Sequence, residues 1–146
     1  NDSPRSFCCN YAVNLLLNHY AGLYTKEKID FEFQVQLPEK LKSGESDVCV
    51  VIGNLLENAL EACIGQQGPY IRAVTRLKGD SGLTIIVDNT APAPPVTDSD
   101  GNLLSTKGNT RGIGTRSIRY IARQYDGKAD FQWENGMFMA SVFLNL

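Results

Sequence analysis

The sequence is poor in the residues that build metal sites and disulfide frameworks. It contains a single histidine, His19, and its four cysteines include no Cys-x-x-Cys pair. This spacing supplies neither a metal-ligand set nor a disulfide framework, so we expect free thiols and a reducing, cytoplasmic environment. Cys49 and Cys63 lie in an apolar stretch, where free cysteine usually behaves as a small hydrophobic residue.

The sequence also lacks an excess of positive charge and a long hydrophobic run. The 146 residues carry a net charge of −2, whereas a nucleic-acid-binding domain normally carries a basic excess on one face. We therefore expect no nucleic-acid partner. No apolar run reaches the roughly 18 residues of a candidate membrane span. Because the sequence opens with Asn1 and has no signal-peptide pattern, we expect a fragment of a longer protein.

The amphipathic segments that the sequence does contain predict the fold class. Helices are predicted from the spacing of apolar residues over about 10–26, 46–64 and 113–125. Strands are predicted from alternation over 29–37, 70–77 and 83–89, and in a closing hairpin over 128–144. The second helix would begin at Ser46 or Asp47, either of which can cap it.

The strands come as hairpins rather than as repeated βαβ units. We therefore expect one α+β domain over residues 1–146, built as a two-layer α/β sandwich. Its sheet would be mixed and mostly antiparallel, with the helices on one face. Residues 90–111 interrupt the regular pattern, because they are rich in Pro, Gly, Ser, Thr and Asp and show no periodicity. So long a connection predicts a functional lid or a disordered loop.

The predicted second helix carries a polar stripe on an otherwise apolar surface. At about 100° per residue, Asn54, Glu57, Asn58 and Glu61 fall on one narrow stripe. A helix that is apolar nearly all round is buried, and buried Asn and Glu need partners. The stripe then faces either a polar cavity that holds a ligand or ion, or simply solvent. Two asparagines in a helix interior favour the cavity, because Asn is a poor helix former.

A glycine-rich turn precedes the predicted third helix. Gly108, Gly112 and Gly114 let the backbone approach a phosphate, and the helix N-terminus adds unpaired N–H donors. Nearby hydroxyls and positive charges come from Thr115, Ser117, Lys107, Arg111 and Arg116. The turn is a candidate anion site, although most such turns are structural. It is neither a P-loop, since no GxxxxGK[ST] occurs, nor a dinucleotide fingerprint, since it does not open a βαβ unit.

In this order, and with a lid between them, the two features resemble the GHKL ATPase superfamily. The stretch from Asn54 to Asn58 resembles its N-box, and the stretch from Arg111 to Thr115 resembles its second glycine box. More narrowly, NLLENALEA, RGIGTRSI and ENGMFMASVFL are similar to catalytic domains of peptide-sensing, quorum-type sensor histidine kinases. The resemblance covers about residues 10–146 and implies the Bergerat-type ATP-binding fold.

The resemblance also implies an ATP site, with ATP and Mg²⁺ as the bound groups. Asn58 takes the place of the asparagine that coordinates Mg²⁺ between the phosphates, an oxygen ligand suited to that ion. Asn54 and Glu57 take the catalytic positions. Asn54 would lie near the phosphates, and Glu57 would help to activate the accepting group or order water. The triphosphate would be wrapped by the lid and the turn, through Lys107, Gly108, Arg111, Gly112, Ile113, Gly114 and Thr115. Residues 90–111 would be the ATP lid.

The sequence departs from the family pattern at two places. The first glycine box normally reads Asp-x-Gly-x-Gly, and its aspartate binds the adenine amino group, but the stretch from Ile85 to Pro92 contains no glycine. Either Asp88 or Asn89 takes the place of that aspartate, and continuing the alternation of the strand selects Asn89. Glu61 stands where many histidine kinases carry a basic residue. A carboxylate there would repel phosphate unless a lysine or arginine compensates.

The function implied by the resemblance is phosphoryl transfer in two-component signalling. The domain would bind Mg-ATP and donate the γ-phosphoryl group to a histidine on a dimerisation helix outside this chain. We expect His19 to be structural rather than the acceptor. The implied partners are that helix of the same full-length kinase and a response regulator. We expect the isolated domain to be a monomer, and the full-length protein to be a homodimeric, membrane-anchored sensor with this domain in the cytoplasm.

Two other interpretations stay open. A degenerate module of the same fold that has lost nucleotide binding would act as a protein-interaction scaffold. The glycine-free first box and Glu61 favour that interpretation. An anti-sigma-type serine kinase would phosphorylate a partner protein instead of its own dimer. The absence of a histidine-bearing helix from the full-length protein would support this third interpretation.

Overall fold

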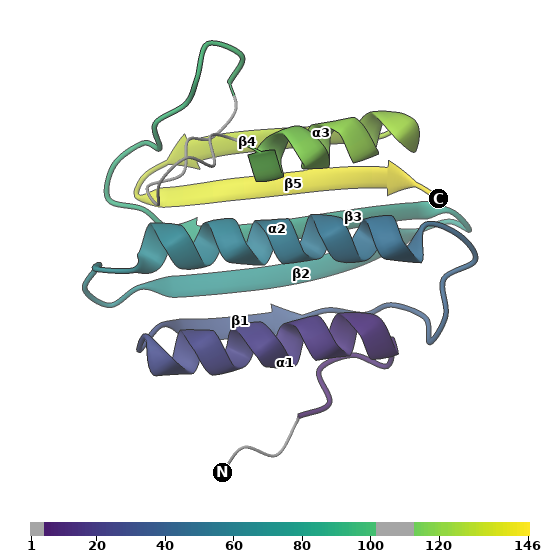
Figure 1. Cartoon of the computed structure of the whole chain (residues 1–146), viewed down its shortest axis with the longest axis horizontal. Coiled ribbons are helices and arrows are strands. Elements are labelled where there is room, and N and C mark those ends of the chain that lie inside the picture. The colour runs from purple at the N-terminus through teal and green to yellow at the C-terminus, as the bar shows by residue number, and fades with distance from the viewer. Residues whose placement is uncertain (1–4, 102–112) are drawn as a thin grey trace.

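The computed structural model describes residues 5–101 and 113–146, which form two layers (Figure 1). The helices are α1 (Tyr11–Lys26), α2 (Glu45–Cys63) and α3 (Ile113–Gln124). The strands are β1 (Asp30–Gln34), β2 (Tyr70–Lys78), β3 (Gly82–Thr90), β4 (Lys128–Glu134) and β5 (Met137–Asn145). This order of elements agrees with the predicted one. In the described ranges, no helix combines the length and apolar character that crossing a bilayer requires.

The strands form one mixed sheet in the order β1-β2-β3-β5-β4. β1 pairs with β2 in parallel, and the other neighbouring strands are antiparallel. All three helices lie on one face of this sheet, with α1 over β1, α2 across the middle and α3 beside β4 and β5 (Figure 1). The expected two-layer α/β sandwich with a mostly antiparallel sheet is therefore confirmed.

The core lies between the helices and the face of the sheet that they cover. Along β3, Leu83, Ile85 and Val87 are each at most 2% exposed and alternate with half-buried residues. β5 alternates in register with β3, so that Ile85 lies opposite the fully buried Val142. α2 supplies much of the facing wall through residues such as the fully buried Leu56. Each such side chain contributes roughly 1.5–3 kcal/mol by leaving water.

The first strand is shorter than the alternation of residues 29–37 predicts. β1 ends at Gln34, although Val35 remains buried. Beyond that point, the Thr75 hydroxyl of β2 accepts a hydrogen bond of 2.8 Å from Gln36 N and donates one of 3.1 Å to Gln36 O. These two side-chain hydrogen bonds take the place of the backbone hydrogen bonds that would pair the two strands. Hydrophobic alternation therefore continues where regular strand pairing has ended.

α2 begins slightly earlier than predicted, and its N-cap differs from the expected one. The N-cap is Gly44 in a left-handed conformation (φ 72°), and not Ser46 or Asp47. The Asp47 carboxylate instead accepts a hydrogen bond of 2.6 Å from the Tyr125 hydroxyl. A Cβ atom at Gly44 would lie 3.0 Å from that hydroxyl oxygen. The positive φ and the close approach of the later chain both require glycine here.

Candidate functional site

The polar stripe of α2 is half-buried. Asn54, Glu57, Asn58 and Glu61 all have intermediate exposure, while the apolar residues around them pack into the core. The stripe is therefore neither part of the apolar core nor a freely exposed solvent face. Polar groups in such an environment need hydrogen-bond partners, and the structure satisfies Glu57 and Asn58 unequally.

Asn58 lies on the side of α2 that faces α3. It follows Asp47 by about three helical turns, and Asp47 bonds Tyr125, the residue directly after α3. The Nδ2 atom of Asn58 is buried and has no hydrogen-bond partner among the described residues. A buried amide without a partner costs about 1–3 kcal/mol. This orphaned group, next to an amide oxygen able to bind a hard cation, fits a ligand-binding role.

Glu57 is adjacent to Asn58 in the sequence, but unlike the Asn58 amide its carboxylate has a hydrogen-bond partner. The Tyr20 hydroxyl of α1 donates a hydrogen bond of 3.0 Å to Glu57 Oε1. Burial raises the pKa of Tyr20, and the neighbouring carboxylates of Glu57 and Glu61 raise it further. The tyrosine therefore remains a donor at physiological pH. The carboxylates of Glu57 and Glu61 therefore both raise the pKa of Tyr20, which belongs to α1.

β3 brings Asn89 to the covered face of the sheet. Asn89 continues the buried alternation of the strand and is 2% exposed. Its Nδ2 donates a hydrogen bond of 2.8 Å to Thr90 O, which also accepts one of 2.7 Å from Gln66 Nε2. Because the Thr90 carbonyl holds the donor end of the amide, the Oδ1 end of Asn89 remains available as an acceptor.

Asp88, the other candidate for the adenine contact, points to the open face. Its carboxylate lies 3.9 Å from the Arg72 guanidinium, and its Oδ1 is buried without a partner in the described part of the chain. Burial raises the pKa of Asp88, and Arg72 partly opposes this effect. Successive residues of a strand point to opposite faces. Of the two candidates, Asn89 alone shares the covered face with α2.

The start of α3 carries the described part of the glycine-rich turn. Ile113, Gly114 and Thr115 lie in the first turn of this helix, and Thr115 is 1% exposed. The helix N-terminus supplies unpaired N–H groups and a positive dipole end. The side chains of residues 113 and 114 are outside the description. Four further predicted residues lie outside the described ranges, namely Lys107, Gly108, Arg111 and Gly112.

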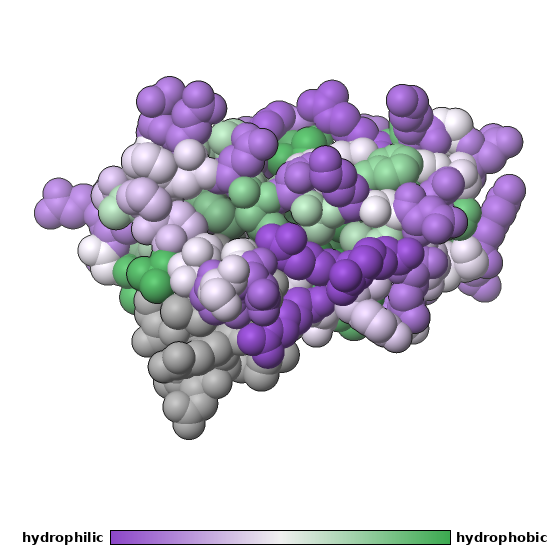
Figure 2. Space-filling model, turned by 90° about the horizontal axis from the view of Figure 1, so that it is seen from above, coloured by the Kyte–Doolittle hydropathy of each residue, from purple (hydrophilic) through white to green (hydrophobic). Residues whose placement is uncertain are grey.

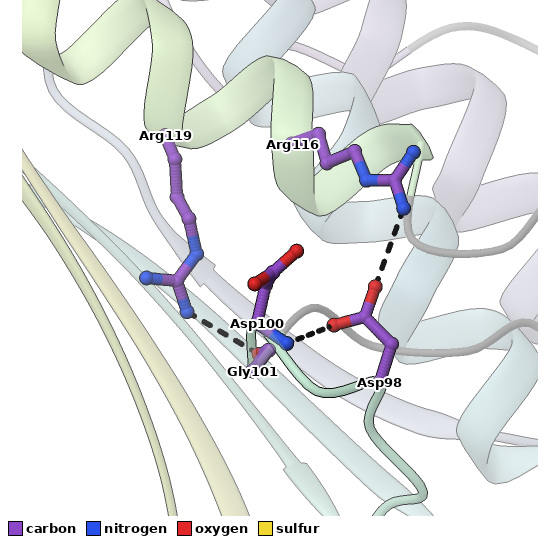
Figure 3. A network of polar contacts seen from close by, with 5 residues as sticks. All are labelled: Asp98, Asp100, Gly101, Arg116 and Arg119. Carbon is purple, nitrogen blue, oxygen red and sulfur yellow. Dashed lines mark hydrogen bonds and ion pairs between the residues drawn. The ribbon is translucent and has the colours of Figure 1, made fainter.

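Contacts that the sequence analysis missed tie residues 98–101 to α3 (Figure 3). Arg116 Nη2 lies 3.3 Å from Asp98 Oδ2, and Arg119 Nη2 donates a hydrogen bond of 3.3 Å to Gly101 O. Asp98 also accepts a hydrogen bond from a backbone N–H two residues further on. Arg116, expected to attract an anion, is thus paired with a carboxylate. Opposite charges 18 residues apart are too common in sequences to have selected this pair.

A groove of about 420 Å³ lies between α2 and α3. It is lined by Asp47 and Val50 of α2 and by Arg116, Ser117, Tyr120, Ile121 and Gln124 of α3. None of the stripe residues lines it, but Arg116 and Ser117 do, the two side chains that the sequence placed near the candidate anion site. Seen from above, the molecule is mostly hydrophilic, with small, separate hydrophobic areas (Figure 2). No group of His, Cys, Asp and Glu able to hold a metal by itself occurs among the residues described.

Comparison with protein families identifies a match over much of the chain. A family model described as "GHKL domain" matches residues 45–145, more than two thirds of the chain. The matched range runs from the start of α2 to the end of β5. It therefore includes the polar stripe, Asn89 and the first turn of α3. No curated protein sequence matches the chain.

Several solved structures share the fold. The catalytic domain of the histidine kinase ThkA matches with a TM-score of 0.73 and 19% identity, over 93% of this chain and 92% of that one. The mycobacterial sensor histidine kinase MprB matches with 0.68 and 12%, over 92% and 93%. The histidine kinase domain of a blue-light activated kinase from Erythrobacter litoralis matches with 0.69 and 12%, over 92% and 60%. At these identities the likeness shows the fold alone.

Proposed function

The chain belongs to the GHKL domain family, and from this premise we propose that it is the ATP-binding catalytic domain of a sensor histidine kinase. It binds Mg-ATP and donates the γ-phosphoryl group to a histidine on a dimerisation helix outside this chain. The observation that carries the proposal is the buried, unpartnered amide of Asn58 on the half-buried stripe of α2. The shared fold with histidine kinase catalytic domains supports it.

Asn89 recognises adenine in this proposal. Its Oδ1 accepts a hydrogen bond from the adenine amino group, while its Nδ2 is held by the Thr90 carbonyl. If the amide flipped, Oδ1 would meet the Thr90 carbonyl oxygen and one acceptor would lose its donor. The orientation therefore favours an amino group over the carbonyl oxygen that guanine presents at the same position. Asp88 does not take this role, because it lies on the open face beside Arg72.

The phosphates lie between the stripe of α2 and the first turn of α3. Asn58 holds Mg²⁺ through its amide oxygen, and Asn54 lies one turn earlier on the same stripe. Thr115 and the N–H groups of the first turn of α3 bind phosphate oxygens. When bound, Mg²⁺ neutralises phosphate charge and orients the triphosphate. Amide oxygens for a hard cation and N–H donors for an anion together fit Mg-ATP.

The proposed partners are the helix that carries the phosphate-accepting histidine and a response regulator. The acceptor histidine lies on a dimerisation helix of the same full-length kinase, because His19 belongs to α1 of the domain itself and contacts Tyr20 edge-on. ThkA has been solved in complex with the response regulator protein TrrA, which supports a response regulator as the downstream partner. The isolated domain is a monomer. The full-length protein is a homodimeric, peptide-sensing kinase, membrane-anchored with this domain in the cytoplasm.

A second candidate function is a scaffold that no longer binds nucleotide. The carboxylate of Glu61 on the half-buried stripe favours it, because a negative charge close to the phosphates repels them. The absence of glycine between Ile85 and Pro92 favours it as well. A serine kinase of the anti-sigma type shares the Mg-ATP site and differs in the acceptor. It is distinguished by a partner protein phosphorylated on serine.

Calorimetric titration of Mg-ATP into the 146-residue chain tests the proposal. We expect saturable binding that EDTA abolishes. Asn58→Ala should weaken binding by about tenfold or more, since a lost metal ligand or charged hydrogen bond exceeds about 1.4 kcal/mol. Gln132→Ala, at an exposed position of β4, is the matched control and should bind like the wild type. No binding at millimolar ATP by a folded protein would refute the proposal and favour the scaffold.

A further inference from the structure

α1 contacts α2 through two tyrosines that lie one helical turn apart. Tyr24 is fully buried, and its hydroxyl donates a hydrogen bond of 2.8 Å to Leu56 O. Tyr20 is 8% exposed, and its hydroxyl donates a hydrogen bond of 3.0 Å to Glu57 Oε1. The first bond reaches a backbone carbonyl, which the helix already orients. The second bond reaches a flexible side chain that carries charge.

The Tyr20 bond gives the Glu57 side chain a definite direction. Tyr20 is the one hydrogen-bond partner of Glu57 within the described residues. A glutamate without such a bond would occupy several rotamers. A hydrogen bond to an ionised acceptor is roughly twice as strong as one between neutral groups. The bond occupies Oε1 and leaves the second carboxylate oxygen of Glu57 free.

This direction separates Glu57 from Asn58. The two residues follow one another and are therefore about 100° apart around the helix. Asn58 lies on the α3 side, together with Asp47, which bonds Tyr125. Glu57 is held on the α1 side by Tyr20. In the proposed function the Mg²⁺ position therefore belongs to Asn58, and the second carboxylate oxygen of Glu57 is available for a different task.

We propose that Tyr20 is a positioning residue that holds Glu57 as the proton acceptor for phosphoryl transfer, an inference that rests on the proposed function. An imidazole nitrogen of the acceptor histidine attacks the γ-phosphorus, and a P–N bond forms. The bond between the γ-phosphorus and its bridging oxygen breaks, and ADP leaves with the electron pair. The proton on the other imidazole nitrogen passes to the free oxygen of Glu57.

Steady-state ATP hydrolysis by the 146-residue chain tests this role, with water in place of imidazole. Water attacks the γ-phosphorus, its proton passes to Glu57, and ADP and phosphate leave. Glu57→Gln should lower kcat about tenfold or more, and Tyr20→Phe about three- to tenfold, as expected for a proton acceptor and its orienting group. The Kd for Mg-ATP should stay within about twofold, because neither residue binds the nucleotide. The double variant should be no slower than Glu57→Gln, because Tyr20 acts through Glu57.

Tyr24→Phe is the matched control. It removes the other tyrosine hydrogen bond between the same two helices, so it should lower Tm about as much as Tyr20→Phe. Its kcat should equal that of the wild type. A purely structural role for Tyr20 predicts instead that the two tyrosine variants change kcat and Tm alike.

The outcomes distinguish this inference from the proposed function. A wild-type chain that does not bind Mg-ATP would refute the proposed function, and this inference with it. Binding without hydrolysis, or with hydrolysis that neither Tyr20→Phe nor Glu57→Gln slows, would refute this inference alone. Additive losses of kcat in the double variant would also refute it, as would weaker Mg-ATP binding by Glu57→Gln.

Discussion

The two sides of α2 differ in how completely their polar groups are satisfied. On the α1 side, Tyr20 bonds Glu57, and Tyr24 bonds a backbone carbonyl. On the α3 side, Asp47 bonds Tyr125 near the start of the helix, but the Asn58 amide further along has no partner within the described ranges. A helix that two tyrosine hydrogen bonds hold on one side, and that keeps an unpartnered amide on the other, combines a support with a surface for a ligand.

β3 repeats this contrast between adjacent residues. Asn89 faces the helices and directs its donor end to Thr90 O, so an acceptor remains for a ligand. Asp88 faces away and is engaged with Arg72. In both elements, adjacent residues point to different sides, and the asparagine of each pair keeps one amide atom without a protein partner among the described residues. Helix and strand periodicity make this division possible.

The largest expected effect concerns the α1 side of α2. Tyr24→Ala removes a fully buried ring and its hydrogen bond to α2, so the free energy of unfolding should fall by about 3–5 kcal/mol. Tyr120→Ala, at a 59% exposed position of α3, should change it by less than about 0.5 kcal/mol. Urea unfolding followed by circular dichroism measures both. Similar losses in the two variants would contradict the idea that the α1 side is the rigid one.

The next effect concerns the two faces of β3. Asn89→Ala should weaken Mg-ATP binding by about tenfold and lower the free energy of unfolding by about 1 kcal/mol, because a hydrogen bond is lost at each end of the amide. Asp88→Ala, on the open face, should leave ATP affinity unchanged. Calorimetric titration of Mg-ATP into both variants shows whether Asn89 or Asp88 contacts adenine. If Asp88→Ala weakens binding as much, the assignment of the adenine contact to the covered face is wrong.

Replacing the unpartnered Asn58 amide should raise the stability of the protein rather than lower it. Asn58→Leu replaces a buried N–H group without a partner by apolar atoms of similar volume, so the free energy of unfolding should rise by about 1 kcal/mol. Mg-ATP binding should be abolished in the same variant. Thermal unfolding and calorimetry measure the two quantities. A destabilised Asn58→Leu would mean that the protein itself satisfies the amide, and the two sides of α2 would then be alike.

The smallest effect depends on pH. Since burial raises the pKa of Asp88 in the folded state, the native protein binds the proton more tightly than the unfolded chain does. Stability contributed by this group is therefore present at low pH and declines as pH rises through the raised pKa. At neutral pH, Asp88→Asn should be more stable than the wild type by less than about 1 kcal/mol, and the difference should vanish at acidic pH. A destabilised variant at neutral pH would show that the Arg72 pair outweighs burial.

Hydrophobic periodicity predicted the elements well and their ends less well. The alternation of residues 29–37 is real, but regular pairing stops at Gln34 because a threonine 39 residues further along bonds Gln36. Similarly, either Ser46 or Asp47 is a reasonable cap by residue type, but Tyr125 takes the Asp47 carboxylate. Local sequence patterns indicate which face of a segment is apolar. They carry no information on which distant side chain reaches the end of the segment.

For the candidate site, the sequence by itself determined which residues share a face. The spacing of the α2 stripe and the alternation of β3 follow from local backbone geometry, which any chain of these residues would adopt. Only the tertiary structure decided that Glu57 turns to Tyr20 and that Arg116 pairs with Asp98. These contacts join residues 37 and 18 positions apart. Their physical cause is the packing of α1, α2 and α3 side by side on one face of the sheet.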